Sequence, residues 1–130
     1  MIKDFKKWHD KKRFLHNEKV RPFFHEREVW FCTLGLNVGF EQDGSGEEFL
    51  RPIVVIKKFN NEVFWGLPLT KIVKRGKYYY QFNIEGKKDI STVVLSQIRL
   101  IDAKRLQYKI GDLGEKDFLE IKKHLIGFLQ

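Results

Sequence analysis

The sequence has little that would support covalent or metal cross-linking. Cys32 is its only cysteine, so no intrachain disulfide is possible and a reducing compartment fits. The four histidines are scattered, and with one cysteine they give no spacing typical of a metal site. No apolar run approaches the roughly 20 residues that span a bilayer, and no apolar signal segment follows the basic start. We therefore expect a cytoplasmic protein that needs no metal or other cofactor.

Repeats and low-complexity tracts are also absent, and the composition is that of one folded domain. Hydrophobic residues make up 42% of the chain and charged residues 32%, which excludes a disordered chain. A length of 130 residues is enough for one core but not for two. The formal net charge of +8 favours a polyanionic partner, such as RNA, DNA, an acidic protein or a membrane surface, without choosing among them.

The first 26 residues differ from the rest. Long side chains recur there at helix spacing, at Phe5, Trp8, Lys12 and Leu15. Proline in Arg21-Pro22 stops the helix, because it disfavours helical geometry in the residue before it. This segment carries a net +4, half the total charge in a fifth of the length. We predict a basic helical extension over residues 1–26, followed by one domain over 27–130. The basic face either follows a phosphate backbone or is simply solvated.

The remaining pattern is that of short β-strands and one helix. Strands are expected at residues 29–34, 53–59, 62–69, 78–84, 91–95 and 98–101. The pair Asn60-Asn61 predicts a type I′ hairpin turn, since asparagine tolerates positive φ. Apolar residues at helix spacing predict a C-terminal helix, at Phe118, Ile121, Leu125 and Phe128. Short antiparallel strands closed by a helix indicate a mainly β fold, a small and partly open barrel.

Arg51 is the first candidate for chemistry. It precedes Pro52, which lacks an N–H and belongs at a strand start, so the arginine is expected at the rim of the sheet. Cleaving RNA without a metal requires stabilisation of extra negative charge on phosphorus, and a guanidinium can donate two hydrogen bonds to phosphate oxygens. The structural alternative is an ion pair of Arg51 with Glu47 or Glu48. Thr70 ends a neighbouring strand and could offer its hydroxyl to the same phosphate, although threonine is also a common strand residue.

Other residues are weaker candidates. His25 lies just before the first strand, where it could act as an acid or base or could be a partly exposed residue without a role. Asp102 and Arg105 are expected to form an internal, structural ion pair. Exposed aromatic side chains near positive charge suit stacking with single-stranded RNA. The aromatic candidates are Trp30, Phe40, Trp65 and the run Tyr78-Tyr79-Tyr80. Most of them must fill the core, and Phe40, in a polar loop, is the one expected to be available.

Several motifs occur in the same order as in one bacterial family. They are Glu28-Val29-Trp30-Phe31, Gly39-Phe40-Glu41-Gln42, Arg51-Pro52-Ile53-Val54, Pro68-Leu69-Thr70, Gln97-Ile98-Arg99, Ile101-Asp102 and Ile110-Gly111-Asp112-Leu113. Each is weak alone, but together they cover about four-fifths of the chain. On these motifs the chain resembles the MazF/PemK toxins of type II toxin–antitoxin systems.

The resemblance implies a fold and an activity. The fold would be an SH3-like barrel of the MazF/CcdB type that forms a homodimer. The activity would be that of an mRNA interferase, a sequence-specific endoribonuclease that cuts single-stranded RNA without a metal and leaves 2′,3′-cyclic phosphate and 5′-hydroxyl ends. An antitoxin with an acidic, flexible segment would occupy the RNA groove.

The family's motifs also assign roles to residues. The catalytic arginine and hydroxyl correspond to Arg51 and Thr70. Glu41, Gln42 and Gln97 correspond to residues that line the RNA groove, beside the stacking candidate Phe40.

Departures from the family pattern narrow the mechanism. Where Phe40 stands, the Kid branch has a histidine used in its chemistry, and the arginine and aspartate that Kid has near the glutamine are here Val94 and Ser96. These differences favour a mechanism based on Arg51 and Thr70. Two alternatives stay open: a CcdB-like inhibitor that binds DNA gyrase without cutting, and an inactive RNA-binding relative, which would show salt-dependent RNA binding alone.

Overall fold

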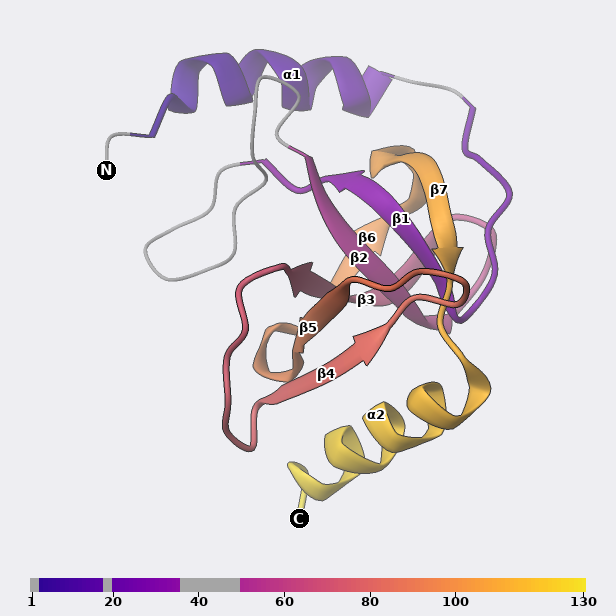
Figure 1. Cartoon of the computed structure of the whole chain (residues 1–130). Coiled ribbons are helices and arrows are strands. Elements are labelled where there is room, and N and C mark those ends of the chain that lie inside the picture. Colours follow the sequence, from indigo (N-terminus) through magenta and orange to yellow (C-terminus); the bar gives the residue numbers. More distant parts are fainter. Residues whose placement is uncertain (1–2, 18–19, 36–49) are drawn as a thin grey trace.

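The structure is a computed structural model that describes residues 3–17, 20–35 and 50–130 (Figure 1). Its elements, in chain order, are α1 (Phe5–Asn17), β1 (Glu28–Thr33), β2 (Leu50–Lys58), β3 (Val63–Thr70), β4 (Tyr79–Asn83), β5 (Ile90–Val94), the 3-10 turn η1 (Leu95–Gln97), β6 (Arg99–Asp102), the 3-10 turn η2 (Ala103–Arg105), β7 (Leu106–Asp112) and α2 (Glu115–Gly127). No helix in these ranges is long and apolar enough to cross a membrane.

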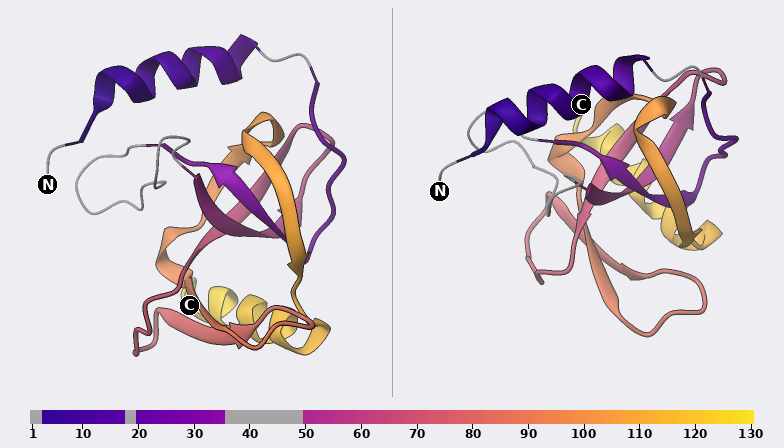
Figure 2. Two further views of the ribbon diagram at one scale, coloured as in Figure 1. Left: turned by 45° about the horizontal axis from the view of Figure 1, so that its top comes forward. Right: turned by 90° about the horizontal axis from the view of Figure 1, so that it is seen from above.

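The strands form one antiparallel sheet that curves into a small open barrel. The strand order is β4-β5-β3-β2-β1-β7, and β6 adds to the other part of β3. Helix α1 lies across one end of this barrel and α2 across the opposite end (Figures 1 and 2). The mainly β fold with a helix at each terminus confirms the fold predicted from the sequence.

Strand β2 is at the centre of the core because both of its faces are buried. Successive side chains of a strand point to opposite faces. Val54 and Ile56 therefore join one apolar cluster, which includes Phe118 of α2. Ile53 and Val55 join the other. The continuous apolar run at 53–56 thus reflects a strand that is covered on two sides.

Helix α1 packs against the barrel through two of the four side chains that were predicted to form one face of the helix. Trp8 and Leu15 are buried, whereas Phe5 is 53% exposed and Lys12 is also exposed. The Trp8 ring lies where a side chain at position 35 would be, a space that Gly35 leaves open. Asp4 caps the helix, since its Oδ1 accepts a hydrogen bond of 3.0 Å from the backbone N–H of Lys7. The extension is therefore packed on the barrel.

Two local predictions are corrected by the structure. In the described residues only Arg27 among non-glycines has positive φ, so Asn60-Asn61 does not form a type I′ turn. Instead, the side-chain oxygen of Asn60 accepts hydrogen bonds from the backbone N–H groups of Glu62 (2.8 Å) and Val63 (2.9 Å). An asparagine side chain that mimics a backbone acceptor permits this turn without positive φ. Strand β7 was not predicted as a strand, because its central residues are exposed and show no alternation.

Candidate functional site

Arg51 lies near the start of β2, at the rim of the sheet as expected. It pairs with Cys32 of β1, and its Nη1 donates a hydrogen bond of 3.3 Å to the carbonyl oxygen of Leu69. Since Leu69 directly precedes Thr70, this bond fixes the guanidinium next to the end of β3. Cys32 itself is fully buried, and burial raises the pKa of its thiol to about 12, so it does not serve as a nucleophile here.

Thr70 is the last residue of β3 and is partly exposed. It pairs with Thr92 of β5, which continues the sheet on that side. Its Oγ1 accepts a hydrogen bond of 3.2 Å from the backbone N–H of Ile72. Because the hydroxyl accepts this bond, its own hydrogen is available to donate to a bound group.

Arg51 and Thr70 line one open cleft of about 440 Å³. The other lining residues are Phe31, Pro52, Leu69, Lys71, Ile84, Lys87, Asp89, Ser91 and Ile110. Three cationic side chains thus accompany one carboxylate and the hydroxyls of Thr70 and Ser91. Such a set binds an oxyanion by charge and by hydrogen bonds. Lys71 and Lys87 were missed from the sequence, because both stand in loops, where charged residues are common.

The other predicted groove residues have different outcomes. Phe40, Glu41 and Gln42 lie outside the described residues, as do Glu47 and Glu48, the alternative ion-pair partners of Arg51. Gln97 ends η1 and is partly exposed, but it is not among the described residues that line the cleft. Its role in base recognition stays a prediction. Within the described ranges, no three His, Cys, Asp or Glu side chains are grouped as metal ligands.

His25 belongs to a separate cluster at the start of β1. Its backbone N–H donates to Glu28 Oε1 (2.8 Å), and its ring Nδ1 lies 3.4 Å from Glu28 Oε2. Burial alone would raise the pKa of Glu28, but hydrogen bonds from Trp30, His25 and Lys109 lower it below its usual value. Glu28 is four residues before Cys32, the strand partner of Arg51. His25 therefore lies beyond the opposite end of β1 from the strand partner of Arg51, and it is not among the residues that line the cleft.

The predicted ion pair between Asp102 and Arg105 is wrong. Asp102 instead accepts two hydrogen bonds of 2.9 Å from Arg21, one from Nε and one from Nη2. Arg105 donates to the carbonyl oxygens of Thr33 (3.3 Å) and Leu34 (3.4 Å). The paired hydrogen bonds of Arg21 are the main cause that lowers the pKa of Asp102.

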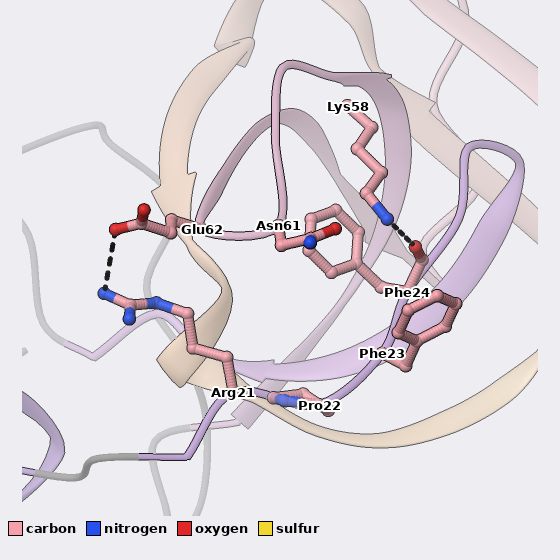
Figure 3. A pocket seen from close by; sticks show the side chains of 7 residues that line it. All are labelled: Arg21, Pro22, Phe23, Phe24, Lys58, Asn61 and Glu62. Atoms are coloured by element: carbon pink, nitrogen blue, oxygen red, sulfur yellow. Dashed lines mark hydrogen bonds and ion pairs between the residues drawn. The ribbon is translucent and has the colours of Figure 1, made fainter.

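Arg21 also lines a pocket of about 490 Å³ between the extension and the β2–β3 turn (Figure 3). Its lining residues are Arg21, Pro22, Phe23, Phe24, Lys58, Asn61 and Glu62. Lys58 Nζ donates to the carbonyl oxygen of Phe24 (2.8 Å), and Arg21 lies 3.9 Å from Glu62. The charged groups here are paired within the chain, so this pocket holds the extension to the turn and is not a candidate active site.

The aromatic candidates divide between the core and one exposed surface. Trp30 is buried, whereas Trp65 is 45% and Tyr78 43% exposed. Both line an apolar groove of about 700 Å³ beside α2. The other residues of this apolar groove are Ile56, Lys57, Phe59, Leu95, Ser96, Ile98, Lys122, Leu125, Ile126, Phe128 and Leu129. A contiguous apolar surface of this kind is typical of a protein–protein interface.

Comparison with known proteins identifies one family. Residues 26–129 match the model of the family described as PemK-like, MazF-like toxin of type II toxin–antitoxin system. Curated protein sequences give no match.

Solved structures with the same fold include MazF from Deinococcus radiodurans. It has 17% identity, covers 85% of this chain and 98% of its own, and gives a TM-score of 0.65. Mycobacterium tuberculosis toxin MazF-mt6 has 14% identity, covers 79% of this chain and 96% of its own, and gives a TM-score of 0.60. An endoribonuclease in complex with its cognate antitoxin, from a mycobacterial species, has 12% identity. The match covers 83% of this chain and 94% of the endoribonuclease chain, with a TM-score of 0.60.

Proposed function

The chain belongs to the family of PemK-like, MazF-like toxins of type II toxin–antitoxin systems, and on this premise we propose that it is a sequence-specific endoribonuclease acting in the cytoplasm. It cuts single-stranded RNA without a metal and leaves 2′,3′-cyclic phosphate and 5′-hydroxyl ends. The observation that supports this proposal is the cleft shared by Arg51 and Thr70. An arginine and a hydroxyl on adjacent strands, with two lysines nearby, suit a phosphodiester.

The chemistry asked of this cleft is a transesterification. The ribose 2′-oxygen loses its proton and attacks phosphorus, and the bond to the 5′-oxygen breaks as that oxygen gains a proton. The intermediate carries extra negative charge on its non-bridging oxygens, which Arg51 stabilises by charge and by hydrogen bonds. Thr70 donates its hydroxyl hydrogen to the same phosphate. Because a guanidinium keeps its proton at neutral pH, the role proposed for Arg51 is stabilisation by its charge and its hydrogen bonds.

Base selection is assigned to the loop that precedes β2, together with Gln97 of η1. Phe40 stacks on a base, in keeping with its place in a polar loop, while Glu41, Gln42 and Gln97 contact base edges, as the family resemblance implies. Stacking tolerates any base, whereas hydrogen bonds to base edges discriminate among them. The polar side chains therefore set the cleavage sequence, and Phe40 adds affinity.

Two protein partners complete the proposal. A cognate antitoxin with an acidic, flexible segment binds over the RNA groove, where the cations of the cleft attract it. A second copy of this chain covers the apolar groove around Trp65 and Phe128. In the described part of the chain this groove gathers several large exposed apolar side chains, and a homodimer would remove them from water.

Cleavage of a long single-stranded RNA in EDTA, by the wild type and by Arg51→Ala, tests the proposed activity. We expect discrete cuts with 5′-hydroxyl ends from the wild type and intact RNA from the variant. Intact RNA from a folded wild-type protein would contradict the proposal, and gyrase inhibition or salt-dependent RNA binding would then be measured.

A further inference from the structure

Between α1 and the barrel lies a smaller cavity of about 240 Å³, separate from the cleft of Arg51 and Thr70. It is lined by Lys12, Leu15, His16, Arg21, Asp102, Lys104 and Arg105. One of its sides is thus made by α1, which precedes the segment matched by the family model. The cavity exists in this chain because Trp8 and Leu15 hold the helix against the barrel.

The charges that line this cavity are not balanced. Four cationic side chains face a single carboxylate, that of Asp102. Asp102 already accepts two hydrogen bonds from Arg21 and one of 2.8 Å from the backbone N–H of Lys104. Lys104 Nζ donates to the carbonyl oxygen of His16 (2.9 Å), and one carboxylate among the lining residues leaves the cavity with an excess of positive charge.

Arg105 is a partly buried cation that contacts α1. Its guanidinium lies 5.6 Å from the centre of the Trp8 ring, and both of its hydrogen bonds come from Nη1 to backbone carbonyls. Within the described part of the chain, its Nε and Nη2 donate no hydrogen bond. Burial, which is the main cause, and the neighbouring Arg99 lower the pKa of Arg105, and the smaller opposite effect of Asp102 does not offset them. An oxyanion would supply both the charge and the acceptors.

The cavity is close to the proposed active site. Arg105 donates to the carbonyl of Thr33, and Thr33 pairs with Leu50, the residue directly before Arg51. The cavity and Arg51 therefore lie at the same end of strands β1 and β2.

We propose that the cavity between α1 and η2 binds a backbone phosphate of the RNA substrate, held by Arg105, Lys104 and Lys12. This inference rests on the proposed function and extends it: the N-terminal helix adds a phosphate contact outside the catalytic cleft. Arginine suits this role because its planar guanidinium gives paired hydrogen bonds to phosphate oxygens. The contact carries no sequence information and adds affinity for any RNA strand.

Binding of a 2′-O-methyl RNA oligonucleotide tests the proposal, because RNA without a free 2′-hydroxyl binds without being cut. Fluorescence anisotropy over a salt series is measured for the wild type, Lys12→Gln and the matched control Lys6→Gln. Lys6 is exposed on the same helix and does not line the cavity. We expect Lys12→Gln to weaken binding several-fold and to reduce the slope of log K against log salt by about 0.7, the value for one single-strand phosphate contact. Equal effects of the two substitutions would overturn the proposal.

Titration with inorganic phosphate, followed by the NMR signal of the Trp8 indole N–H, separates a free-anion site from an RNA contact. Saturation in the wild type, lost in Lys12→Gln, together with the change in RNA binding, supports the proposal. Saturation with unchanged RNA binding would overturn the assignment to RNA. So would an effect of Lys12→Gln on an acidic antitoxin peptide alone. If the wild-type protein binds RNA through the cavity but cuts no RNA in EDTA, the proposed nuclease activity is contradicted, whereas the phosphate site in the cavity is not.

Discussion

The guanidinium of Arg51 donates a 3.3 Å hydrogen bond to the carbonyl oxygen of Leu69, the residue that directly precedes Thr70. This bond crosses from β2 to β3 and aligns the charge of one strand with the hydroxyl at the end of the next. Each strand has a run of buried residues close to these groups, 53–56 in β2 and 66–69 in β3, so the two groups are held on a rigid support. Groups fixed before substrate binds need no reorganisation during the reaction, which is how electrostatic catalysis becomes effective.

Substitution of Arg51 is expected to separate catalysis from folding. Arg51→Ala should reduce RNA cleavage by about 10²–10³-fold or more, the usual effect of removing a group that stabilises transition-state charge. Arg51→Lys keeps the charge but loses the paired donors, so its cleavage rate should lie between those of the wild type and Arg51→Ala. Gel-based cleavage rates and thermal unfolding give the two readouts. Near-normal cleavage by a folded Arg51→Ala protein would contradict the assignment.

The contribution of Thr70 to RNA cleavage is expected to depend on its hydroxyl group and not on the shape of its side chain. Thr70→Val keeps the volume but removes the donor to phosphate and the acceptor for the Ile72 N–H. We expect cleavage to fall at least ten-fold and stability to fall by about 1 kcal/mol, the cost of one lost hydrogen bond. Thr70→Ser restores both functions, so it should retain most of the activity. If serine and valine behave alike in single-turnover cleavage, the hydroxyl has no catalytic role.

The ion pair of Arg21 with Asp102 predicts a pH dependence of stability. Because Arg21 lowers the pKa of Asp102 in the folded protein, this pair stabilises the fold above the unfolded pKa of about 4 and the effect is lost as pH falls through the folded value. Asp102 is 40% exposed and Glu62 also faces Arg21, so screening limits the effect to about 1 kcal/mol.

Urea unfolding of the wild type and of Arg21→Gln at pH 7 and pH 3 measures this effect. The difference in unfolding free energy between the two proteins should be larger at pH 7 than at pH 3. An equal difference at both pH values would show that Arg21 stabilises the fold by packing alone.

The elements that could be predicted from the sequence are those with a local periodicity of apolar residues. Contacts between residues far apart in the chain could not be predicted. The apolar run at 53–56 and the helix stripe of α2 were both recognisable, because burial imposes their periods on the chain. The pairing of Arg21 with Asp102 joins residues 81 positions apart, and no local pattern indicates it. Strand β7 pairs with β1 with two register shifts. These shifts disrupt the alternation of buried and exposed side chains by which a strand is recognised in a sequence.

For the candidate site, the family motifs named Arg51 and Thr70, and the structure brings both to one cleft. Lys71 and Lys87 could not be found in this way. They reach the cleft through the loops that follow β3 and β4, and loop geometry is not encoded by hydrophobic period.

Gly35 is expected to be essential for the attachment of α1. It has φ of +77°, and the Trp8 ring lies where its side chain would be. Gly35→Ala should therefore destabilise the backbone by about 1 kcal/mol and also displace Trp8. Gly86→Ala is the matched control, because Gly86 has φ of +78° but no atoms near the position of a Cβ. Hydrogen exchange should speed up in α1 for Gly35→Ala only, and equal exchange in α1 for both variants would contradict this packing.

Dimerisation through the apolar groove beside α2 is expected to depend on Trp65. This side chain is 45% exposed in the single chain, and its ring packs edge-on against Phe59, 5.0 Å away. Trp65→Glu would place a charge in an interface from which water is excluded, so the variant should be monomeric in light scattering at concentrations where the wild type is a dimer.

Leu119→Glu is the control for that experiment, since Leu119 is 58% exposed on α2 but does not line the apolar groove. It adds the same charge at an exposed position outside the groove and should leave the dimer intact. A wild type that is monomeric at tens of micromolar, on the order of ordinary assay concentrations, would contradict the homodimer. Dissociation by Leu119→Glu with a stable Trp65→Glu dimer would move the interface to the outer side of α2.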